Sequence, residues 1–314
     1  MKRKMKYETK LSTKSNYNYF GNELRAIFKE NIYKISLETG FTCPTRDGTK
    51  GNKGCHYCGA TGSHFVNINK NIPIIEQVKN GKRFMSSRYR AKKFIAYFQS
   101  FTSTYGDLEI LKKHLQDAIK DESIVGLDLS TRPDCLSEEV LDVITPIMKG
   151  LYHWLEIGLE SSHDKTLASI NRGHSMQDFE DAYLRCKKRG LRVCVHVILG
   201  LPGETEEMMM QTVTRLIALN IDGIKFHNLH IVKNSVFEQE YKAGNINLFS
   251  LEEYTHILAN IIAILPEEII VHRLAGDAPK DHLIAPDWTF LKQTSLNYIE
   301  NYLIDNNIYQ GMDA

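Results

Sequence analysis

The sequence lacks any long apolar segment and any export signal. None of its apolar runs reaches the roughly 18 residues that a membrane span requires. The first 14 residues are rich in lysine but lack the apolar stretch of a signal peptide. We therefore expect a cytosolic (cytoplasmic) protein. The 314 residues also contain no convincing internal repeat, low-complexity tract or long linker, so one large domain with small extensions fits the length better than two independent domains.

Cysteine is scarce, and half of the six cysteines lie close together. Without an export signal, so few cysteines in a chain of this length indicate metal ligands or catalytic thiols rather than a disulfide framework. The clustered residues, spaced C-x11-C-x2-C, are Cys43, Cys55 and Cys58. We expect Cys186 and Cys194 to be buried and inert, because they lie in apolar helical and strand patterns. The role of Cys135 stays undecided.

Three clustered thiolates favour metal ligation but leave the metal open. Glycines between these cysteines permit the tight backbone that a metal loop needs. A zinc ion normally takes a fourth ligand, and His56 or His64 would complete a Cys3His site. A [4Fe-4S] cluster held by three thiolates would instead leave one iron free to bind another group, as a catalytic cluster requires.

Apolar runs of strand length alternate with segments of helical spacing along most of the chain. The expected strands cover residues 32–37, 94–99, 125–129, 154–159, 193–199, 223–231 and 269–272. The clearest helix follows Ser175 as its N-cap and ends before Gly190, and another follows Thr205. Repeated βα units with apolar strands predict an α/β fold, in which a parallel sheet covered on both faces forms a complete or partial (β/α) barrel.

Polar residues, glycine and proline follow the expected strands. The strand ends read YFQSFTSTYG, LDLSTRPDC, LEIGLESS, VHVILGLPGET, KFHNLH and HRLAGD. Parallel α/β folds place their chemistry at the carboxyl ends of the strands, although glycine and proline also end strands without any further role. Because six such segments recur at corresponding positions, we expect a ligand-binding site at this edge of the sheet.

The motifs together resemble the radical S-adenosylmethionine (SAM) superfamily, although the first cysteine gap is wider than in the commonest C-x3-C-x2-C form. Wider gaps occur in the branch that includes the Elp3-like enzymes. The segments CPTRDG, GCHYC, STRPDC, EIGLES, INRGH, ILGLPGET and HRLAGD resemble the small bacterial YhcC/YtqA-like family from about Ile32 to Asp277. The resemblance implies a partial (β/α)6 TIM-like barrel at residues 31–277, with an N-terminal extension at 1–30 and a C-terminal helical extension at 278–314.

The resemblance also implies the cofactors. Cys43, Cys55 and Cys58 would hold a [4Fe-4S] cluster, and its fourth iron would bind the amino and carboxylate groups of SAM. The reduced cluster would cleave SAM, and the 5′-deoxyadenosyl radical would abstract a hydrogen atom from the substrate. A low-potential electron donor such as flavodoxin or ferredoxin is expected. No G-x-G-x-x-G segment opens a βαβ unit, which disfavours an ordinary Rossmann methyltransferase or dehydrogenase.

Further SAM contacts are implied by the strand ends of related radical SAM enzymes. A Gly-Gly-Glu motif after the second strand is missing, so Gln99, Ser100 or backbone would hold the SAM amino group. The guanidinium of Arg172 suits a carboxylate, but Arg172 and Glu160 would alternatively pair with each other. The residues assigned to SAM are Gln99, Ser100, Ser130, Arg132, Glu160, Arg172, His196 and Gly200.

The resemblance implies tRNA as the substrate, with a carboxymethylaminomethyl group at C5 of the wobble uridine converted towards aminomethyl. Residues 77–106 contain no acidic residue and interleave basic with aromatic side chains, a mixture suited to phosphate contact and base stacking. The basic residues are Lys79, Lys82, Arg83, Arg88, Arg90, Lys92 and Lys93. The alternative is ordinary solvated surface, with residues 94–98 as a core strand.

Four residues near the last two strands are candidate substrate ligands or proton carriers: Lys225, His227, His230 and Arg273. Their alternative role is that of core residues with internal partners. Two other functions compete with the tRNA hypothesis. A radical SAM enzyme acting on a small metabolite or peptide would not need the basic stretch, and a zinc-stabilised binding protein would bind neither SAM nor iron.

Overall fold

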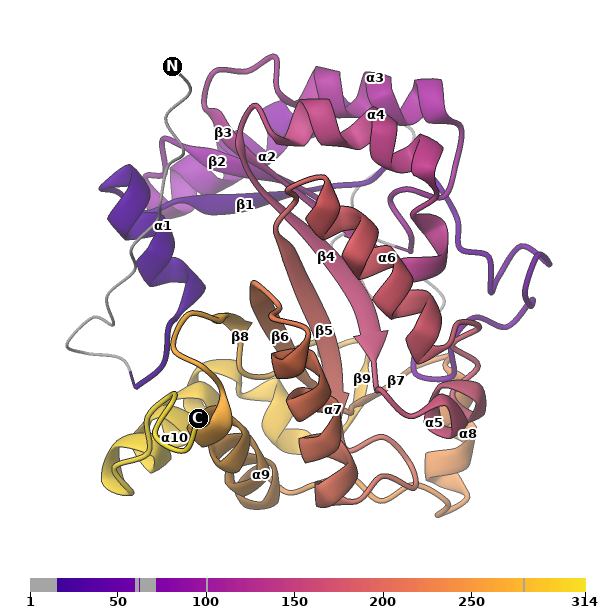
Figure 1. The fold of residues 1–314 in the computed structure, drawn as a ribbon, viewed down its shortest axis with the longest axis vertical. Helices are drawn as coiled ribbons and strands as arrows, with labels where there is room; N and C mark the ends of the chain where they lie inside the picture. The colour runs from indigo at the N-terminus through magenta and orange to yellow at the C-terminus, as the bar shows by residue number, and fades with distance from the viewer. Residues whose placement is uncertain (1–15, 60–61, 63–71, 100, 279) are drawn as a thin grey trace.

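The computed structural model describes residues 16–59, 62, 72–99, 101–278 and 280–314. Seven parallel strands form one curled sheet in the order β1-β2-β3-β4-β5-β6-β8, and helices cover its outer face (Figure 1). These strands are β1 Tyr33–Leu37, β2 Phe94–Phe98, β3 Ile124–Thr131, β4 Tyr152–Glu160, β5 Val193–Leu199, β6 Gly223–Asn228 and β8 Ile270–Arg273. The expected α/β partial barrel is therefore confirmed.

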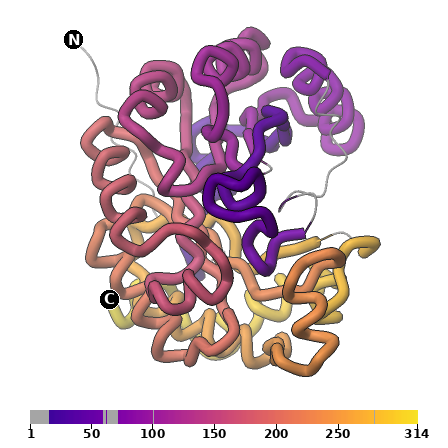
Figure 2. Tube along the Cα trace, turned by 90° about the vertical axis from the view of Figure 1, so that its right-hand side faces the viewer, coloured from indigo at the N-terminus to yellow at the C-terminus, as the bar shows by residue number. Residues whose placement is uncertain are grey.

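The helices follow the strands in regular βα alternation. Figure 2 shows the purple and magenta helices of the first half above the orange and yellow segments of the second. The helices are α1 Phe20–Phe28, α2 Ile74–Tyr89, α3 Leu108–Ala118, α4 Glu138–Met148, α5 Asp164–Ser169, α6 Met176–Lys188, α7 Glu206–Ala218, α8 Val236–Lys242, α9 Leu251–Ile264 and α10 Lys292–Asp305. Ser175 caps α6 in a capping box with Asp178, and Thr205 caps α7, as the sequence predicts. None of the helices in the described ranges is long and apolar enough to cross a membrane.

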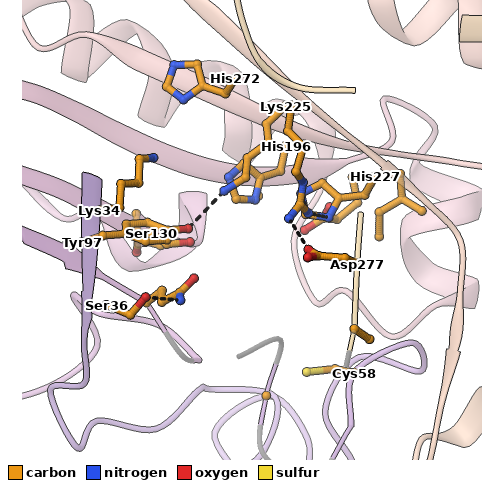
Figure 3. Close-up of a pocket in the computed structure, with 18 of the residues that line it drawn as sticks. Lys34, Ser36, Cys58, Tyr97, Ser130, His196, Lys225, His227, His272 and Asp277 are labelled. Carbon is orange, nitrogen blue, oxygen red and sulfur yellow. Dashed lines mark hydrogen bonds and ion pairs between the residues drawn. The ribbon is translucent and has the colours of Figure 1, made fainter. Parts of the chain in front are cut away.

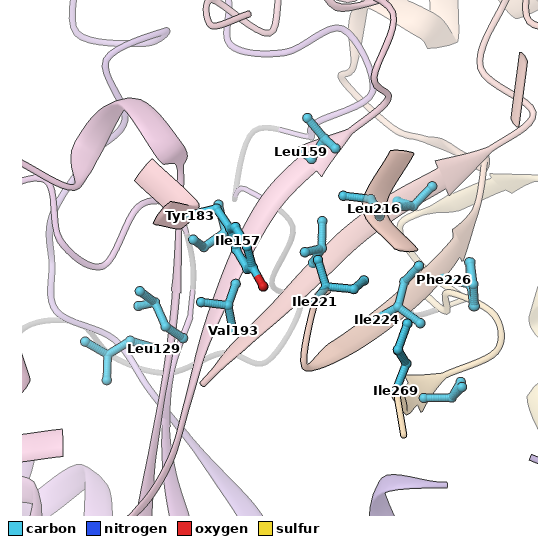
Figure 4. Packing of buried hydrophobic residues seen from close by; sticks show 14 of the residues in the cluster. Leu129, Ile157, Leu159, Tyr183, Val193, Leu216, Ile221, Ile224, Phe226 and Ile269 are labelled. Atoms are coloured by element: carbon cyan, nitrogen blue, oxygen red, sulfur yellow. The ribbon is translucent and has the colours of Figure 1, made fainter. Parts of the chain in front are cut away.

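The hydrophobic core lies between the sheet and the outer helices. Figure 4 shows this packing, in which Ile157 and Val193 of the sheet lie near Tyr183 of α6. Cys186 is fully buried in the same cluster, as expected. Because side chains alternate along a strand, the apolar outer positions leave the inner positions of the same strands free for polar residues. The inner face therefore carries the candidate site.

Helix α1 fills the inner face at the amino-terminal ends of the strands. Phe20 and Leu24 pack there with Trp154, Cys194 and Ile270. The backbone before α1 continues the sheet edge, since the Val271 amide donates to the Asn18 carbonyl over 2.9 Å. Phe20 and Leu24 of α1 also line the cavity on this side of the sheet.

The two terminal regions of the described chain contact each other. Asn18 N donates to Gln310 Oε1 over 2.8 Å, and Asn16 Nδ2 donates to the Ile308 carbonyl over 2.8 Å. The expected extensions at 1–30 and 278–314 thus pack on the barrel where they are described, and the limits of the three regions stay predictions.

The strand expected at 223–231 is wrong in its length. Strand β6 ends at Asn228, and Ile231–Val232 forms β7, which pairs antiparallel with β9 (Leu283–Ala285) in a separate two-stranded sheet. Ile231 is buried in a second apolar cluster. The apolar run therefore continues past Asn228, although β6 pairs with β5 and β8 whereas β7 pairs with β9. Periodicity cannot reveal such a change of partner.

Candidate functional site

A cavity of about 1070 Å³ lies on the inner side of the curled sheet. It extends from the cysteine loop after β1 to the carboxyl ends of β6 and β8 (Figure 3). Of the residues predicted from the sequence, its lining includes Cys43, Cys55, Cys58, Gln99, Ser130, Arg132, Glu160, Arg172, His196, Lys225, His227, His230 and Arg273. Ser100 lies outside the described residues, and Gly200 is described but is not part of the lining. The volume exceeds the roughly 1000 Å³ at the upper end of ordinary small-molecule sites.

The cysteine loop is held by its own backbone and by one arginine. Arg46 Nη2 donates to the Gly59 carbonyl over 2.6 Å, and Gly54 N donates to the Thr45 carbonyl over 2.8 Å. Gly54 has φ +73°, and a Cβ at this position would lie 2.8 Å from Arg46 Nε, so the close approach requires glycine. This arrangement directs all three thiols into the cavity.

Cations surround the thiols. Arg172 Nη1 lies 3.5 Å and Arg132 Nη1 3.8 Å from the Sγ of Cys55. Burial acts to raise the pKa of Cys43, but the charge of Arg132 and a hydrogen bond from Thr45 outweigh it, so the pKa of Cys43 is lowered. Such surroundings favour thiolates, which are the form that ligates metals.

Burial raises the pKa of Cys58 to about 11. Cys58 would therefore stay a thiol on its own, and only a bound cation would hold it as a thiolate.

The geometry favours a cluster over a single zinc ion. The ring of His56 packs against Phe237 with 6.0 Å between centroids and is not part of the cavity lining. His64, the other candidate fourth ligand, lies outside the described residues. Among the described side chains, no three His, Cys, Asp or Glu residues are close enough to hold one metal ion. Three thiolates that share a cavity fit a multi-iron cluster, whose irons each take a separate thiolate.

Arg172 and Glu160 form an ion pair, with 3.3 Å between Nη2 and Oε1. The ion pair that the sequence analysis gave as an alternative to SAM binding is thus present, but both of its residues also line the cavity. The Nε of Arg172 is buried and has no hydrogen-bond partner within the described part of the chain. Glu160 has φ +78°, an uncommon conformation for a residue other than glycine, and the register with β5 shifts just before it. Arg172 and Glu160 therefore both lie at the wall of the cavity, where they can pair with each other and still contact a ligand.

A network of buried charges occupies the middle of the inner face. Its centre is Glu156 of β4, which accepts hydrogen bonds from Lys225 Nζ at 2.6 Å, His196 Nε2 at 2.8 Å and Lys34 Nζ at 2.8 Å. Tyr97 donates to the same carboxylate over 2.8 Å. Burial opposes ionisation of Glu156, but the charges of Lys225 and Lys34 outweigh it and hold its pKa well below the usual range.

Asp128 behaves differently from Glu156, although Lys34 bonds to both. Burial and the neighbouring charge of Glu156 raise the pKa of Asp128 to about 8. Asp128, which also pairs with Lys34, therefore takes up a proton more readily than Glu156 does. Sequence reasoning missed Lys34, Asp128 and Glu156; the available signal was a single charged residue at an inward position of an otherwise apolar strand.

The carboxyl ends of β6 and β8 form the far wall of the cavity. Arg273 Nη2 lies 2.6 Å from His227 Nδ1, and Arg273 Nη1 donates to Asp277 Oδ1 over 3.2 Å. Burial, together with the charge of Arg273, holds the pKa of His227 well below its usual value, so this ring is neutral. In Figure 3, His227 and Asp277 lie across the cavity from Cys58. The structure thus brings the predicted substrate residues Lys225, His227, His230 and Arg273 to one wall.

The basic stretch does not join this wall. Lys82, Arg83, Arg88 and Arg90 lie on or just after α2, which packs outside β1, and are not part of the cavity lining. Lys82 pairs with Asp121 over 2.5 Å. The guanidinium of Arg88 lies 5.9 Å and 5.3 Å from the ring centroids of Phe84 and Tyr89. Both aromatic side chains are exposed, whereas the aromatic residues of β2 are buried core, as the alternative interpretation held.

Comparisons with known proteins agree with this site. Residues 47–216 match the radical SAM superfamily model, and residues 221–305 match the radical SAM C-terminal domain. The chain therefore belongs to the radical SAM superfamily.

Two relatives extend the match over nearly the whole chain. YtqA of Bacillus subtilis is 35% identical over 300 residues, which cover 96% of this chain and 93% of the relative. YhcC of Escherichia coli K12 is 38% identical over 292 residues, which cover 93% of each chain. Within the superfamily, this chain is a member of the YhcC-like family, which is related to Elp3.

The fold also resembles a solved relative. The structure of Elp3 from the archaeon Methanocaldococcus infernus matches with a TM-score of 0.68 and 17% identity, over 89% of this chain and 64% of that one. At this identity the likeness shows the shared fold.

The superfamily uses a [4Fe-4S] cluster and SAM, and the residues present fit both. Arg132 and Arg172 lie next to the thiols in the cavity, and the Nε of Arg172 has no hydrogen-bond partner among the described residues. Cys43, Cys55 and Cys58 would hold the cluster, and Arg172, Arg132 and Ser130 would contact SAM beside it. When bound, these cofactors supply the one-electron cleavage of SAM and the abstraction of a hydrogen atom. The protein side chains bind, orient and exclude water.

Proposed function

We propose that this radical SAM enzyme acts on tRNA and converts the carboxymethylaminomethyl side chain at C5 of the wobble uridine towards aminomethyl. The YhcC/YtqA-like motifs carry the choice of substrate. The observation in the structure that supports it is the cavity of about 1070 Å³, which continues from the cysteine loop to a wall of cations and histidines. Such a volume has room for SAM together with an extruded nucleoside. A wobble base is single-stranded in its loop, so little unpairing opposes its entry.

The exposed side of α2 would contact the nucleotides around the target. Phe84 and Tyr89 are 54% and 44% exposed and flank Arg88, an arrangement that suits base stacking and phosphate contact. Because α2 lies outside the cavity, these residues would bind the RNA backbone and not the reacting base. We place the enzyme in the cytoplasm, with a flavodoxin or ferredoxin as its electron donor.

One observation favours a second candidate, a radical SAM enzyme that acts on a small metabolite or peptide. Three of the seven basic residues already have acidic partners, since Lys79 pairs with Glu76, Lys82 with Asp121 and Lys93 with Glu30. Exposed pairs of this kind are ordinary surface features. The zinc-stabilised binding protein is set aside by membership of the superfamily.

The nucleoside composition of tRNA from cells that lack the gene tests the substrate. We expect carboxymethylaminomethyluridine to accumulate and its aminomethyl product to disappear. A plasmid with the wild-type gene should restore the product, whereas the Cys55→Ala variant should not. An unchanged nucleoside composition would leave the small-molecule candidate as the better proposal.

The contribution of α2 is tested by replacing Lys82, Arg83, Arg88 and Arg90 with glutamine. Each lost phosphate contact should lower the slope of log affinity against log salt by about 0.7 to 0.9, and the variant should keep its iron and its substrate-free SAM cleavage. A matched control replaces four exposed basic residues on other helices and loops, Lys112, Lys149, Lys188 and Arg215. Equal effects of the two sets would show that α2 is not a specific interface.

A further inference from the structure

The far wall of the cavity carries more positive than negative charge. The cations of this wall and of the adjacent buried network, all part of the lining, are Lys34, Lys225, Arg273 and Lys292. Among the described residues, Glu156 and Asp277 oppose them, and Asp128 pairs with Lys34 as a weaker third carboxyl group, because burial and the charge of Glu156 raise its pKa to about 8. Burial lowers the pKa of Lys225, yet the balance stays positive even with that amine neutral. Unbalanced positive charge in a partly enclosed space favours an anionic ligand.

Arg273 is the cation of this wall that is best placed for such a ligand. Asp277 and His227 hold its two terminal nitrogens and so fix the plane of the guanidinium. Its Nε has no hydrogen-bond partner among the residues that the structure describes, and its side chain is 25% exposed. A guanidinium that is fixed in plane and not fully bonded suits a planar oxyanion.

Hydrogen-bond acceptors lie next to this guanidinium. His230 Nδ1 donates to the Asn228 carbonyl over 3.1 Å, so Nε2 of the neutral ring is an acceptor. The Oδ1 of Asn228 is buried and has no donor in the described ranges. Gly276 packs against both, since a Cβ there would lie 3.4 Å from His230 Cε1 and 3.5 Å from Asn228 Oδ1. Acceptors beside a cation suit a ligand whose N–H group lies close to its anionic group.

We propose that this wall binds the carboxylate of the substrate side chain, with Arg273 as the anchor and the neighbouring amine directed at His230 and Asn228. The inference rests on the proposed function, because a carboxymethylaminomethyl group carries one carboxylate a single methylene away from its amine. A tRNA phosphate offers the same anion chemistry. Because Arg273 lies inside the cavity, the carboxylate of the substrate side chain is favoured over a phosphate of the RNA backbone. The binding experiment separates these two anions.

The test measures binding by the cofactor-loaded enzyme without reductant, so that no turnover occurs. Three anticodon stem-loop RNAs that differ only at the wobble position are compared: carboxymethylaminomethyluridine, aminomethyluridine and uridine. The wild-type protein should bind the first RNA about tenfold or more tightly than the other two, the size expected for one charge-assisted hydrogen bond. Fluorescence anisotropy gives the three affinities.

Single substitutions then show which residues cause the tighter binding of the carboxymethylaminomethyluridine RNA. Arg273→Gln should reduce the affinity for the first RNA to the level of the other two and leave those unchanged. Lys292→Gln, at an exposed residue that pairs with Asp277 over 2.6 Å, should lower the same preference by a few-fold without affecting folding. Arg215→Gln, on the outer surface beside Glu180, is the control and should behave as wild type.

Each outcome decides a separate point. An equal loss of affinity for all three RNAs in Arg273→Gln would identify a phosphate contact and overturn the proposal. Equal binding of the three RNAs by the wild type would also overturn it, while the tRNA function would stand. Failure of the wild type to bind any of them would overturn the proposed function, and this inference with it.

Discussion

The two ends of the cavity are built in different ways. The cysteine end is a loop, and its residues are close in sequence and recognisable as a motif. The far wall at β6 and β8 and the buried network beside it are made from inward positions of β1, β4, β6 and β8, and their residues are spread over most of the chain. A sequence motif therefore specifies the end proposed for the cofactors, whereas only the curvature of the sheet assembles the end proposed for the substrate.

The largest effect is expected at the cysteine end. Cys55→Ala should abolish SAM cleavage and lower the iron content, because it removes one of three ligands. Iron analysis and measurement of 5′-deoxyadenosine after anaerobic reconstitution provide the readout. Cys186→Ala is the matched control, since Cys186 is buried in the outer core, and it should retain both properties. Full cleavage activity in Cys55→Ala would remove this loop from the cluster site.

In the buried network beside the far wall, Glu156→Gln should mainly reduce stability. The substitution leaves Lys34 and Lys225 without their common carboxylate, and breaking a buried ion pair typically destabilises by about 3 to 5 kcal/mol. Urea unfolding measures the change. Glu180→Gln, which removes the half-buried partner of the exposed Arg215 on the outer surface, should change stability by about 1 kcal/mol or less. Similar values for both variants would mean that the network does not hold this wall together.

Arg172→Ala tests the cysteine end again, because Arg172 contacts Cys55 and pairs with Glu160 of β4. We expect SAM affinity to fall about tenfold or more, with iron content unchanged, since a charged hydrogen bond is worth about 1.5 to 3 kcal/mol. Ser130→Ala should also lower SAM affinity, but by a smaller factor. Equilibrium dialysis measures the SAM affinity. If it is unchanged in both variants, the role of Arg172 is confined to its ion pair with Glu160.

The smallest effect concerns the pH dependence of stability. The folded-state pKa of Asp128, about 8, lies above its usual value of 3.8, so the folded protein binds an extra proton between these values. This contribution to stability is fully present below about pH 4 and is lost as the pH rises towards 8. Between pH 6.5 and 7.5, wild type should lose about 1 kcal/mol more free energy of unfolding than Asp128→Asn. Parallel pH profiles of the two proteins would contradict the raised pKa.

The sequence predicted those parts of the molecule that depend on local pattern. The seven strands of the main sheet follow from apolar runs, and the cysteine triplet follows from its spacing. Glu156 did not stand out, because an acidic residue in a strand looks the same in the sequence whether it faces solvent or the inside of a barrel. Its partners come from β1, β5 and β6, so only the curled sheet shows that these charges meet.

In residues 77–106, the sequence suggested a common surface for residues that the fold separates. Residues 77–106 look like one surface in the sequence, yet Phe94 and Tyr97 are buried in β2 while Arg88 lies on the outside. The acidic partners Asp121 and Glu30 come from other parts of the chain. Composition within a window cannot show partners that folding brings from outside it.

The contact between the terminal regions bears on the order of folding. Asn18 and Gln310 are 292 positions apart, and closing so long a loop is entropically unfavourable until other contacts have formed. The segment at Asn18 also bonds to β8 and leads into α1, which packs on the inner face of the sheet. This end of the barrel is therefore expected to close late, after the strands around the cysteine loop have paired.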